Sequence, residues 1–100
     1  MIQHILLFKF RPGTPDEAIQ KIVNKFLECK EKLAGFTSMD YGRNVSAKQE
    51  LSKGFNYGVI MSFENEGVIS LYNGLEEHKE AQQLQVPYVE EVLVFDINVM

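Results

Sequence analysis

The sequence has little of what disulfide-stabilised, secreted or membrane-spanning proteins need. Its 100 residues include one cysteine, Cys29, so no disulfide can form within the chain. The longest apolar run, residues 5–8, is far too short to span a bilayer. The first ten residues also lack the basic region and the small-residue cleavage site of a signal peptide. We therefore expect a cytoplasmic protein in a reducing compartment, with no membrane partner.

Positive charge is scarce as well. Ten Lys and Arg residues stand against fourteen Asp and Glu residues, which gives a net charge of -4. No cluster of Lys or Arg appears, so we expect no nucleic-acid partner. The hydrophobic fraction of 45% is ordinary for a globular protein, and the length fits one domain over residues 1–100.

The hydrophobic pattern predicts alternating strands and helices. Residues 2–10 form a strand with His4, Leu6 and Phe8 on one face. An amphipathic helix follows, beginning at a capping box of Thr14 and Glu17 and ending near Gly35. The remaining elements are strands over 36–45, 55–64 and 92–99, and helical segments over 65–72 and 76–86, with a polar connection over 46–54.

This β-α-β-β-α-β order predicts the α+β class and a ferredoxin-like fold. In that fold a four-stranded antiparallel sheet carries its helices on one face, because the crossovers are right-handed. Asn65 is expected to cap the second helix, and Asn73-Gly74 to interrupt it.

The sheet face without helices is predicted to be apolar. Such a face is larger than the apolar patches that monomers usually expose, so we expect a homodimer in which two sheets pack face to face. The alternative is a monomer whose open face is partly covered by residues 46–54. The expected dimer-interface residues are Ile5, Leu7, Ile60, Leu93 and Phe95.

Two histidines and one tyrosine are the candidates for chemistry. A neutral His78 can accept a proton near neutral pH, but it can equally be a solvated residue in a polar helical turn. Tyr72 can assist it only if the helix breaks between them, since six helical residues separate side chains by roughly 240°. His4 faces the helices and needs a hydrogen-bond partner, which backbone or Tyr57 could supply.

Neither a metal nor a cofactor is expected. No Cys or His neighbours either histidine at the spacing of a zinc site, and the carboxylates are too scattered to specify calcium or magnesium. Cys29 has no activating histidine nearby in the sequence, so a buried structural thiol is expected.

Five segments together resemble the stress-responsive A/B barrel (Dabb) family. They are "HILLFKF", "GRNVS", "GFNYGVIMSFE", "YNGLEEHKEA" and "EEVLVFDIN". The resemblance implies a dimeric α/β barrel. A related plant enzyme cyclises a linear polyketide with a histidine base and an assisting tyrosine, which match His78 and Tyr72, and a further pocket histidine matches His4. The His-Pro-x-His string common in the family is here Leu75-Glu76-Glu77-His78, and a third-strand histidine is replaced by Tyr57.

Three functions follow from this interpretation. The first is a stress-related homodimer that binds a small hydrophobic or aromatic ligand between helices and sheet. The second is a cofactor-independent cyclase or isomerase that uses His78 as base and Tyr72 as hydrogen-bond donor. The third is a barrel monooxygenase, which the absence of tryptophan makes the least favoured. The expected pocket residues are His4, Leu6, Phe8, Phe26, Tyr57 and Val59.

Overall fold

The structure, a computed structural model, describes all residues from 1 to 100. In chain order its elements are β1 (Ile2–Phe10), α1 (Asp16–Lys32), β2 (Phe36–Arg43), the 3₁₀ helix η1 (Gln49–Leu51), β3 (Tyr57–Phe63), α2 (Glu66–Asn73), α3 (Glu76–Gln85) and β4 (Val89–Asn98). The strands form one sheet in the order β2-β3-β1-β4, with every neighbouring pair antiparallel. The predicted ferredoxin-like arrangement is therefore confirmed.

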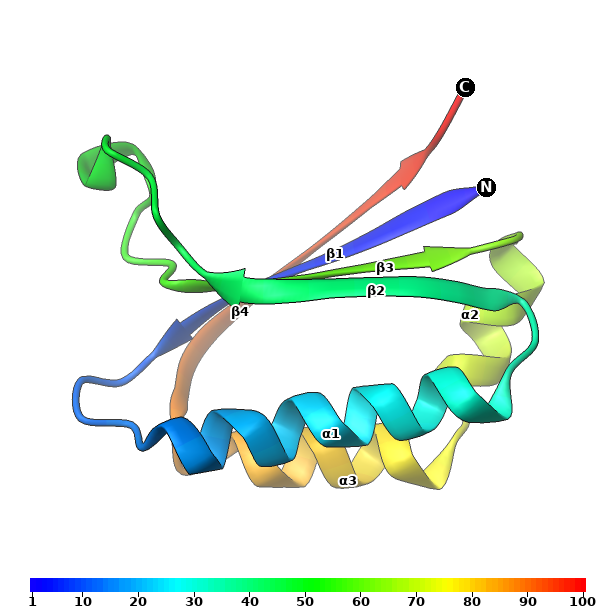
Figure 1. Ribbon diagram of the computed structural model, residues 1–100, viewed down its shortest axis with the longest axis horizontal. Helices are drawn as coiled ribbons and strands as arrows, with labels where there is room; N and C mark the ends of the chain where they lie inside the picture. The colour runs from blue at the N-terminus through cyan, green and yellow to red at the C-terminus, as the bar shows by residue number, and fades with distance from the viewer.

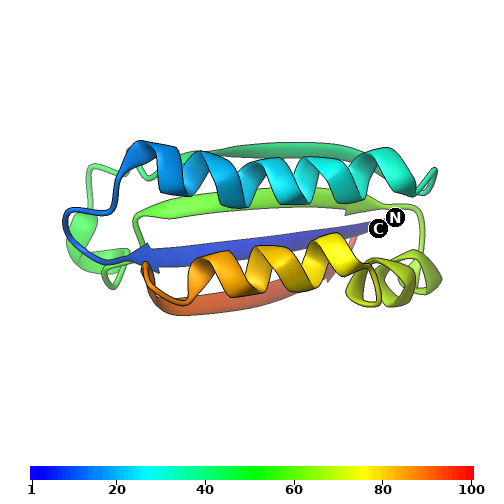
Figure 2. The same ribbon diagram turned by 90° about the horizontal axis from the view of Figure 1, so that it is seen from below.

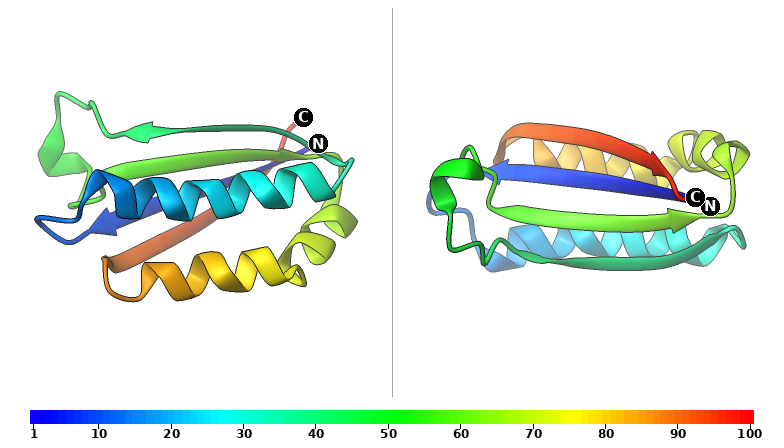
Figure 3. Two further views of the ribbon diagram at one scale, coloured as in Figure 1. Left: turned by 60° about the horizontal axis from the view of Figure 1, so that its bottom comes forward. Right: turned by 90° about the horizontal axis from the view of Figure 1, so that it is seen from above.

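All the α-helices cover the same face of the sheet (Figure 1). Seen from the helical side, α1 and α3 run side by side, and α2 lies at one end (Figure 2). The right-hand view of Figure 3 shows the other face of the sheet, which no α-helix covers. No helix is long and apolar enough to cross a membrane.

The core fills the space between the helices and the sheet. Along β1 the burial alternates as predicted, with the even-numbered residues buried against the helices. Aromatic rings are in contact through this layer, and the rings of Phe36 and Phe63 lie 4.6 Å apart. The largest fully buried side chains are Tyr72, Phe8, Phe26, Phe63, Ile22, Met61, Val23, Val59 and Cys29.

The predicted capping box at the start of α1 is wrong. Pro15, in an extended conformation, is the N-cap, and no side chain caps the helix. Its carbonyl accepts hydrogen bonds from the amides of Ala18 and Ile19, so the helix begins at Asp16. The Thr14 hydroxyl instead donates to the carbonyl of Arg11 in the preceding turn. Acidic residues in the first turn still suit the positive end of the helix dipole.

Gly35 does not end α1. The helix ends at Lys32, and Leu33 is already extended. Gly35 lies instead against α2, where an added Cβ would come within 2.5 Å of Val68 Cγ2. The absence of a side chain at Gly35 therefore lets α2 pack closely on this turn. The predicted cap of α2 is confirmed, since the Asn65 side chain accepts from the Val68 amide.

The open face of the sheet carries the apolar residues expected there. Across the strands, Asp40, Ile60, Ile5 and Phe95 form one row of directly paired residues. Phe95 is 58% exposed, and Ile60 and Leu93 are about two-fifths exposed, at 38% and 40%. An apolar strip therefore runs across β3, β1 and β4 with nothing in this chain to cover its middle. Residues 46–54, expected to be a plain connection, include η1 and rise over one end of this face (Figure 1).

Candidate functional site

A cavity of about 270 Å³ lies between the sheet and the helices, on the side of the molecule formed by β4, α2 and α3. Its floor comes from the helix-facing side of β1 and β4, and its walls come from α1, α2 and α3. The lining residues are His4, Leu6, Phe8, Phe26, Ile69, Tyr72, Asn73, His78, Gln82, Gln85, Val92, Val94 and Asp96. On the floor Leu6, Phe8, Val92 and Val94 are apolar, whereas His4 and Asp96 are polar.

A break between α2 and α3 brings Tyr72 and His78 together. Helix α2 ends at Asn73, and Gly74 keeps a right-handed conformation as its C-cap. The change of direction falls on Leu75, which is extended and serves as the N-cap of α3. As a result the rings of Tyr72 and His78 lie 4.6 Å apart in an edge contact. The predicted interruption at Asn73-Gly74 is confirmed, although glycine's access to positive φ is not what produces it.

Two polar atoms of this pair lack partners. Tyr72 Oη and His78 Nδ1 are both buried, and neither makes a hydrogen bond within the chain. Most buried polar atoms in native proteins are paired, because an unpaired one costs about 1–3 kcal/mol. Both residues also line the cavity, so the two unpaired atoms belong to side chains beside a space that a small molecule can occupy.

Burial shifts the pKa values of both groups towards their neutral forms. Desolvation, followed by the nearby His4, lowers the pKa of His78 below its usual 6.5, and the Asn73 backbone offsets part of this change. Desolvation also raises the pKa of the Tyr72 hydroxyl far above its usual 10. At neutral pH the site thus presents a neutral imidazole next to a protonated phenol.

His4 and Asp96 form a second polar pair in the same cavity. The two residues are paired directly across β1 and β4, and His4 Nδ1 lies 2.5 Å from Asp96 Oδ1. An ionised carboxylate only accepts hydrogen bonds, so Nδ1 must carry the proton. His4 is 7% exposed, and its ring makes an edge contact with the Tyr72 ring, with the ring centres 5.7 Å apart. Asp96 therefore fixes the orientation of a ring that lies against Tyr72.

The partner of His4 is a correction to the expectation from sequence. Backbone or Tyr57 was expected, but Tyr57 lies further along β3, where its ring contacts Phe10. Asp96 is 92 residues away in the sequence, so only the register of β1 with β4 brings it to His4. The one available signal was an acidic residue in an otherwise apolar final strand.

The cavity includes four of the six residues expected to form a pocket. His4, Leu6, Phe8 and Phe26 line it, while Tyr57 and Val59 lie outside it. Both outsiders face the helical layer, but Val59 is fully buried, and Tyr57 lines a separate pocket between α1 and β2. The unforeseen lining residues are Ile69, Asn73, Gln82, Gln85, Val92, Val94 and Asp96.

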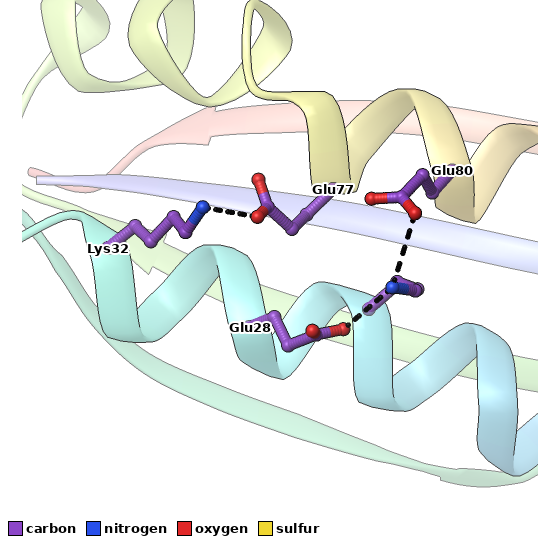
Figure 4. A network of polar contacts seen from close by, with 5 residues as sticks. Glu28, Lys32, Glu77 and Glu80 are labelled. Carbon is purple, nitrogen blue, oxygen red and sulfur yellow. Dashed lines mark hydrogen bonds and ion pairs between the residues drawn. The ribbon is translucent and has the colours of Figure 1, made fainter.

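Ion pairs hold α3, and with it His78, against α1 (Figure 4). Lys32 Nζ bonds to Glu77, the residue before His78, and this pair lowers the pKa of the Glu77 carboxyl. Lys25 Nζ lies 3.4 Å from Glu80 Oε2 and 3.3 Å from Glu28 Oε2. Each exposed pair is worth little alone, but together they align the two helices.

Neither the charges nor the thiol of this region form a further site. No group of three His, Cys, Asp or Glu side chains is placed to hold a metal ion. Cys29 is fully buried, and desolvation raises the pKa of its thiol to about 11. A thiol with this pKa is a poor nucleophile at neutral pH, in line with the structural role expected of it.

Comparison with known proteins identifies the family. A sequence model of the stress responsive A/B barrel domain matches residues 2–99. The chain belongs to the stress-responsive A/B barrel domain family. A relative in this family is the stress-response A/B barrel domain-containing protein HS1 of Arabidopsis thaliana, which is 22% identical over 95 residues. That match covers 95% of this chain and 86% of the relative.

Solved structures share the fold of this family member. A hydroxynitrile lyase from Passiflora edulis superposes with a TM-score of 0.83 at 13% identity, covering 99% of this chain and 93% of the enzyme. A protein from Thermobifida fusca, described as dimeric, ferredoxin-like and of unknown function, gives a TM-score of 0.79 at 12% identity. The match covers 98% of this chain and 90% of that protein. At such identities these likenesses establish the fold.

Proposed function

We propose that the cavity binds a small, largely apolar molecule that places an oxygen beside Tyr72 and His78. The observation that carries this proposal is the pair of unpartnered buried atoms, Tyr72 Oη and His78 Nδ1. A carbonyl oxygen would accept a hydrogen bond from the Tyr72 hydroxyl, and an adjacent acidic hydrogen would face the imidazole. The apolar part of the floor suits an aliphatic or aromatic body.

The ligand is expected to be uncharged in the part that enters the cavity. No Lys or Arg lines the cavity, and the one ionisable carboxyl there, Asp96, is already next to His4. A carboxylate or phosphate would therefore lose its hydration without gaining a counter-ion, which is strongly unfavourable. A neutral ketone, aldehyde or similar carbonyl compound matches these groups.

Acetophenone and benzoate provide a matched pair of probes, since they have similar shapes and differ in charge. Calorimetry is expected to detect acetophenone binding and no benzoate binding. Tyr72→Phe should weaken acetophenone binding about tenfold, which corresponds to the loss of one hydrogen bond worth about 1.4 kcal/mol. Equal binding of the two probes, or binding unaffected by Tyr72→Phe, would exclude this function for the cavity.

A second candidate function is proton abstraction next to a carbonyl. It is favoured by the lowered pKa of His78, which keeps the imidazole neutral and able to accept a proton at neutral pH. A C–H bond would break, its proton would pass to His78, and its electrons would form an enolate. The Tyr72 hydroxyl, which stays protonated, would donate a hydrogen bond to the enolate oxygen. The similar fold of a hydroxynitrile lyase shows that the fold accommodates catalysis.

Deuterium exchange into the methyl group of acetophenone tests this step without knowledge of the natural substrate. In D₂O the protein should accelerate the exchange, and His78→Gln should reduce the rate to that of buffer. Tyr72→Phe should reduce it roughly 10²-fold or more, as removal of one oxyanion donor does in other enzymes. If His78→Gln exchanges as fast as the parent, the catalytic proposal is wrong and only the binding proposal remains.

We also propose that the protein is a homodimer joined through the open face of the sheet. The support is the uncovered apolar row through Ile60, Ile5 and Phe95, together with the similar Thermobifida fusca protein that is described as dimeric. Light scattering at micromolar concentration should give twice the chain mass of 11.5 kDa. A mass of one chain would contradict this assembly.

A further inference from the structure

A second space adjoins the cavity of Tyr72 and His78, at the end of the sheet where both chain termini lie (Figure 1). Its volume is about 350 Å³, and we call it the outer compartment. Its lining residues are Ile2, Glu66, Ile69, Ser70, Asp96 and Asn98. Of these, Ile69 and Asp96 also line the first cavity. The boundary between the two spaces is therefore formed by one aliphatic residue and one carboxylate residue.

The register of β1 with β4 gives both spaces a common floor. The pairs of helix-facing residues follow one another along the two strands in the order Phe8–Val92, Leu6–Val94, His4–Asp96 and Ile2–Asn98. The pairs up to His4–Asp96 line the first cavity, and the last pair lines the outer compartment. At about 3.4 Å per residue, this floor is roughly 20 Å long. A linear molecule can therefore lie along it with one end in each space.

Polar groups of the outer compartment are free to bind a ligand. Asp96 accepts one hydrogen bond, from His4 to Oδ1, and its side chain is still 45% exposed. No Lys, Arg or His lines the compartment, and Glu66 takes part in no ion pair. A ligand hydroxyl suits this place, because it can donate to a carboxylate and accept from the carboxamide of Asn98. A ligand carboxylate would instead meet carboxylates without a counter-ion.

We infer that the two spaces form one elongated binding site for a chain with a neutral carbonyl group at one end and a hydroxyl group at the other. The carbonyl group lies beside Tyr72 and His78, and the chain passes Ile69, which is partly buried against the core. The hydroxyl group donates to a carboxylate of the outer compartment. This inference rests on the proposed binding function and adds the length of the ligand and its second polar group.

Ketones that differ only at the far end of the chain test this site by calorimetry. The hexyl chain of hexyl methyl ketone is about as long as the step from His4 to Ile2 along β1, which is about 7 Å. Its ω-hydroxy derivative should bind about tenfold more tightly than the ketone itself, because it gains a hydrogen bond to a carboxylate. Its ω-carboxylate derivative should bind more weakly than the ketone.

The same titrations separate this inference from the function on which it rests. A chain end that stayed in water would make the hydroxy and carboxylate derivatives bind equally well, and that result would overturn the elongated site while leaving the first cavity as a ketone site. If neither acetophenone nor any of the longer ketones bound, the proposed function would be refuted, and this inference with it.

Ser70→Trp tests the outer compartment by filling it from α2. The variant should lose the tenfold advantage of the hydroxy derivative over hexyl methyl ketone. Leu71→Trp is the matched control, because Leu71 is the next residue of α2, is 61% exposed and lines neither space. It should keep the advantage. Equal preference for the hydroxy derivative in both variants would overturn the inference.

Glu66→Lys tests the charge of the compartment by reversing it, at an exposed position in the first turn of α2. The variant should bind the ω-carboxylate derivative at least about threefold more tightly than the parent protein does, because a repulsive contact becomes an ion pair. Glu64→Lys makes the same change of charge outside the compartment and should bind this derivative as the parent does. Equal effects of the two substitutions would contradict a chain end beside Glu66.

Discussion

The rings of Tyr72 and His78 lie 4.6 Å apart although the two residues belong to different helices. On one continuous helix they would point in directions roughly 240° apart. The extended conformation of Leu75 removes this separation and places both side chains on the same cavity. The site therefore depends on the end of one helix and the beginning of the next.

Tyr72→Phe is expected to stabilise the protein in the absence of ligand. The Tyr72 hydroxyl is buried without a partner, so its removal should raise the free energy of unfolding by about 1–3 kcal/mol. Urea denaturation measures this change. Tyr41→Phe, whose side chain is 44% exposed, is the control and should change stability by no more than about 0.5 kcal/mol. A destabilised Tyr72→Phe protein would mean that the hydroxyl has a partner.

His78 should make stability depend on pH in the weakly acidic range. Its pKa is lowered in the folded protein, so below about 6.5 the unfolded chain binds a proton that the folded chain does not. The free energy of unfolding should therefore fall as the pH drops from 6.5 towards the folded pKa. Denaturation at several pH values should show a smaller fall in His78→Gln over this range. Parallel curves for the two proteins would contradict the lowered pKa.

Gly35 and Val68 should be coupled through the packing of α2. Gly35→Ala brings a methyl group against the stiff Val68 side chain, and this overpacking is expected to cost about 1–3 kcal/mol. Val68→Ala removes the obstacle, so the double variant should lose less stability than the two single variants added together. A double-mutant cycle by urea denaturation measures the coupling, and strict additivity would contradict the close contact.

Phe95→Glu should separate the proposed dimer. Phe95 is exposed in the single chain, so the substitution is compatible with its fold, but it would bury an unpaired charge between two sheets. The dissociation constant should rise at least about 100-fold, because such a charge costs several kcal/mol. Leu71→Glu, at an exposed apolar position on α2, is the control. Light scattering over a dilution series should show dissociation for Phe95→Glu alone.

The sequence was sufficient for the fold because each element has its own local pattern. Three predicted features are present in the structure: the alternating burial along β1, the apolar face of α1 and the Asn65 cap of α2. Each of them depends only on residues that are close in the sequence. Element boundaries were predicted less accurately. Strand β4 begins at Val89, three residues before the predicted start, because pairing with β1 extends it through two glutamates. Long-range pairing of this kind has no local pattern.

The candidate site could be predicted only in part for the same reason. Tyr72 and His78 were identified from residue type and from a break in a helical pattern, both of which are local, and from the resemblance to the family. The His4–Asp96 pair depends on strand register across the whole chain, and the exclusion of Tyr57 from the cavity depends on which helix covers which strand. Charge and hydrophobic patterning do not determine either one.

The most direct test of the proposed site is NMR of the labelled rings of His78 and Tyr72 during titration with acetophenone and, separately, with benzoate. The proposal predicts that the ring signals of both residues shift with acetophenone to a saturable limit and stay unchanged with benzoate. Signals that do not move with acetophenone, or that move equally with both compounds, would contradict a cavity built for an uncharged carbonyl group.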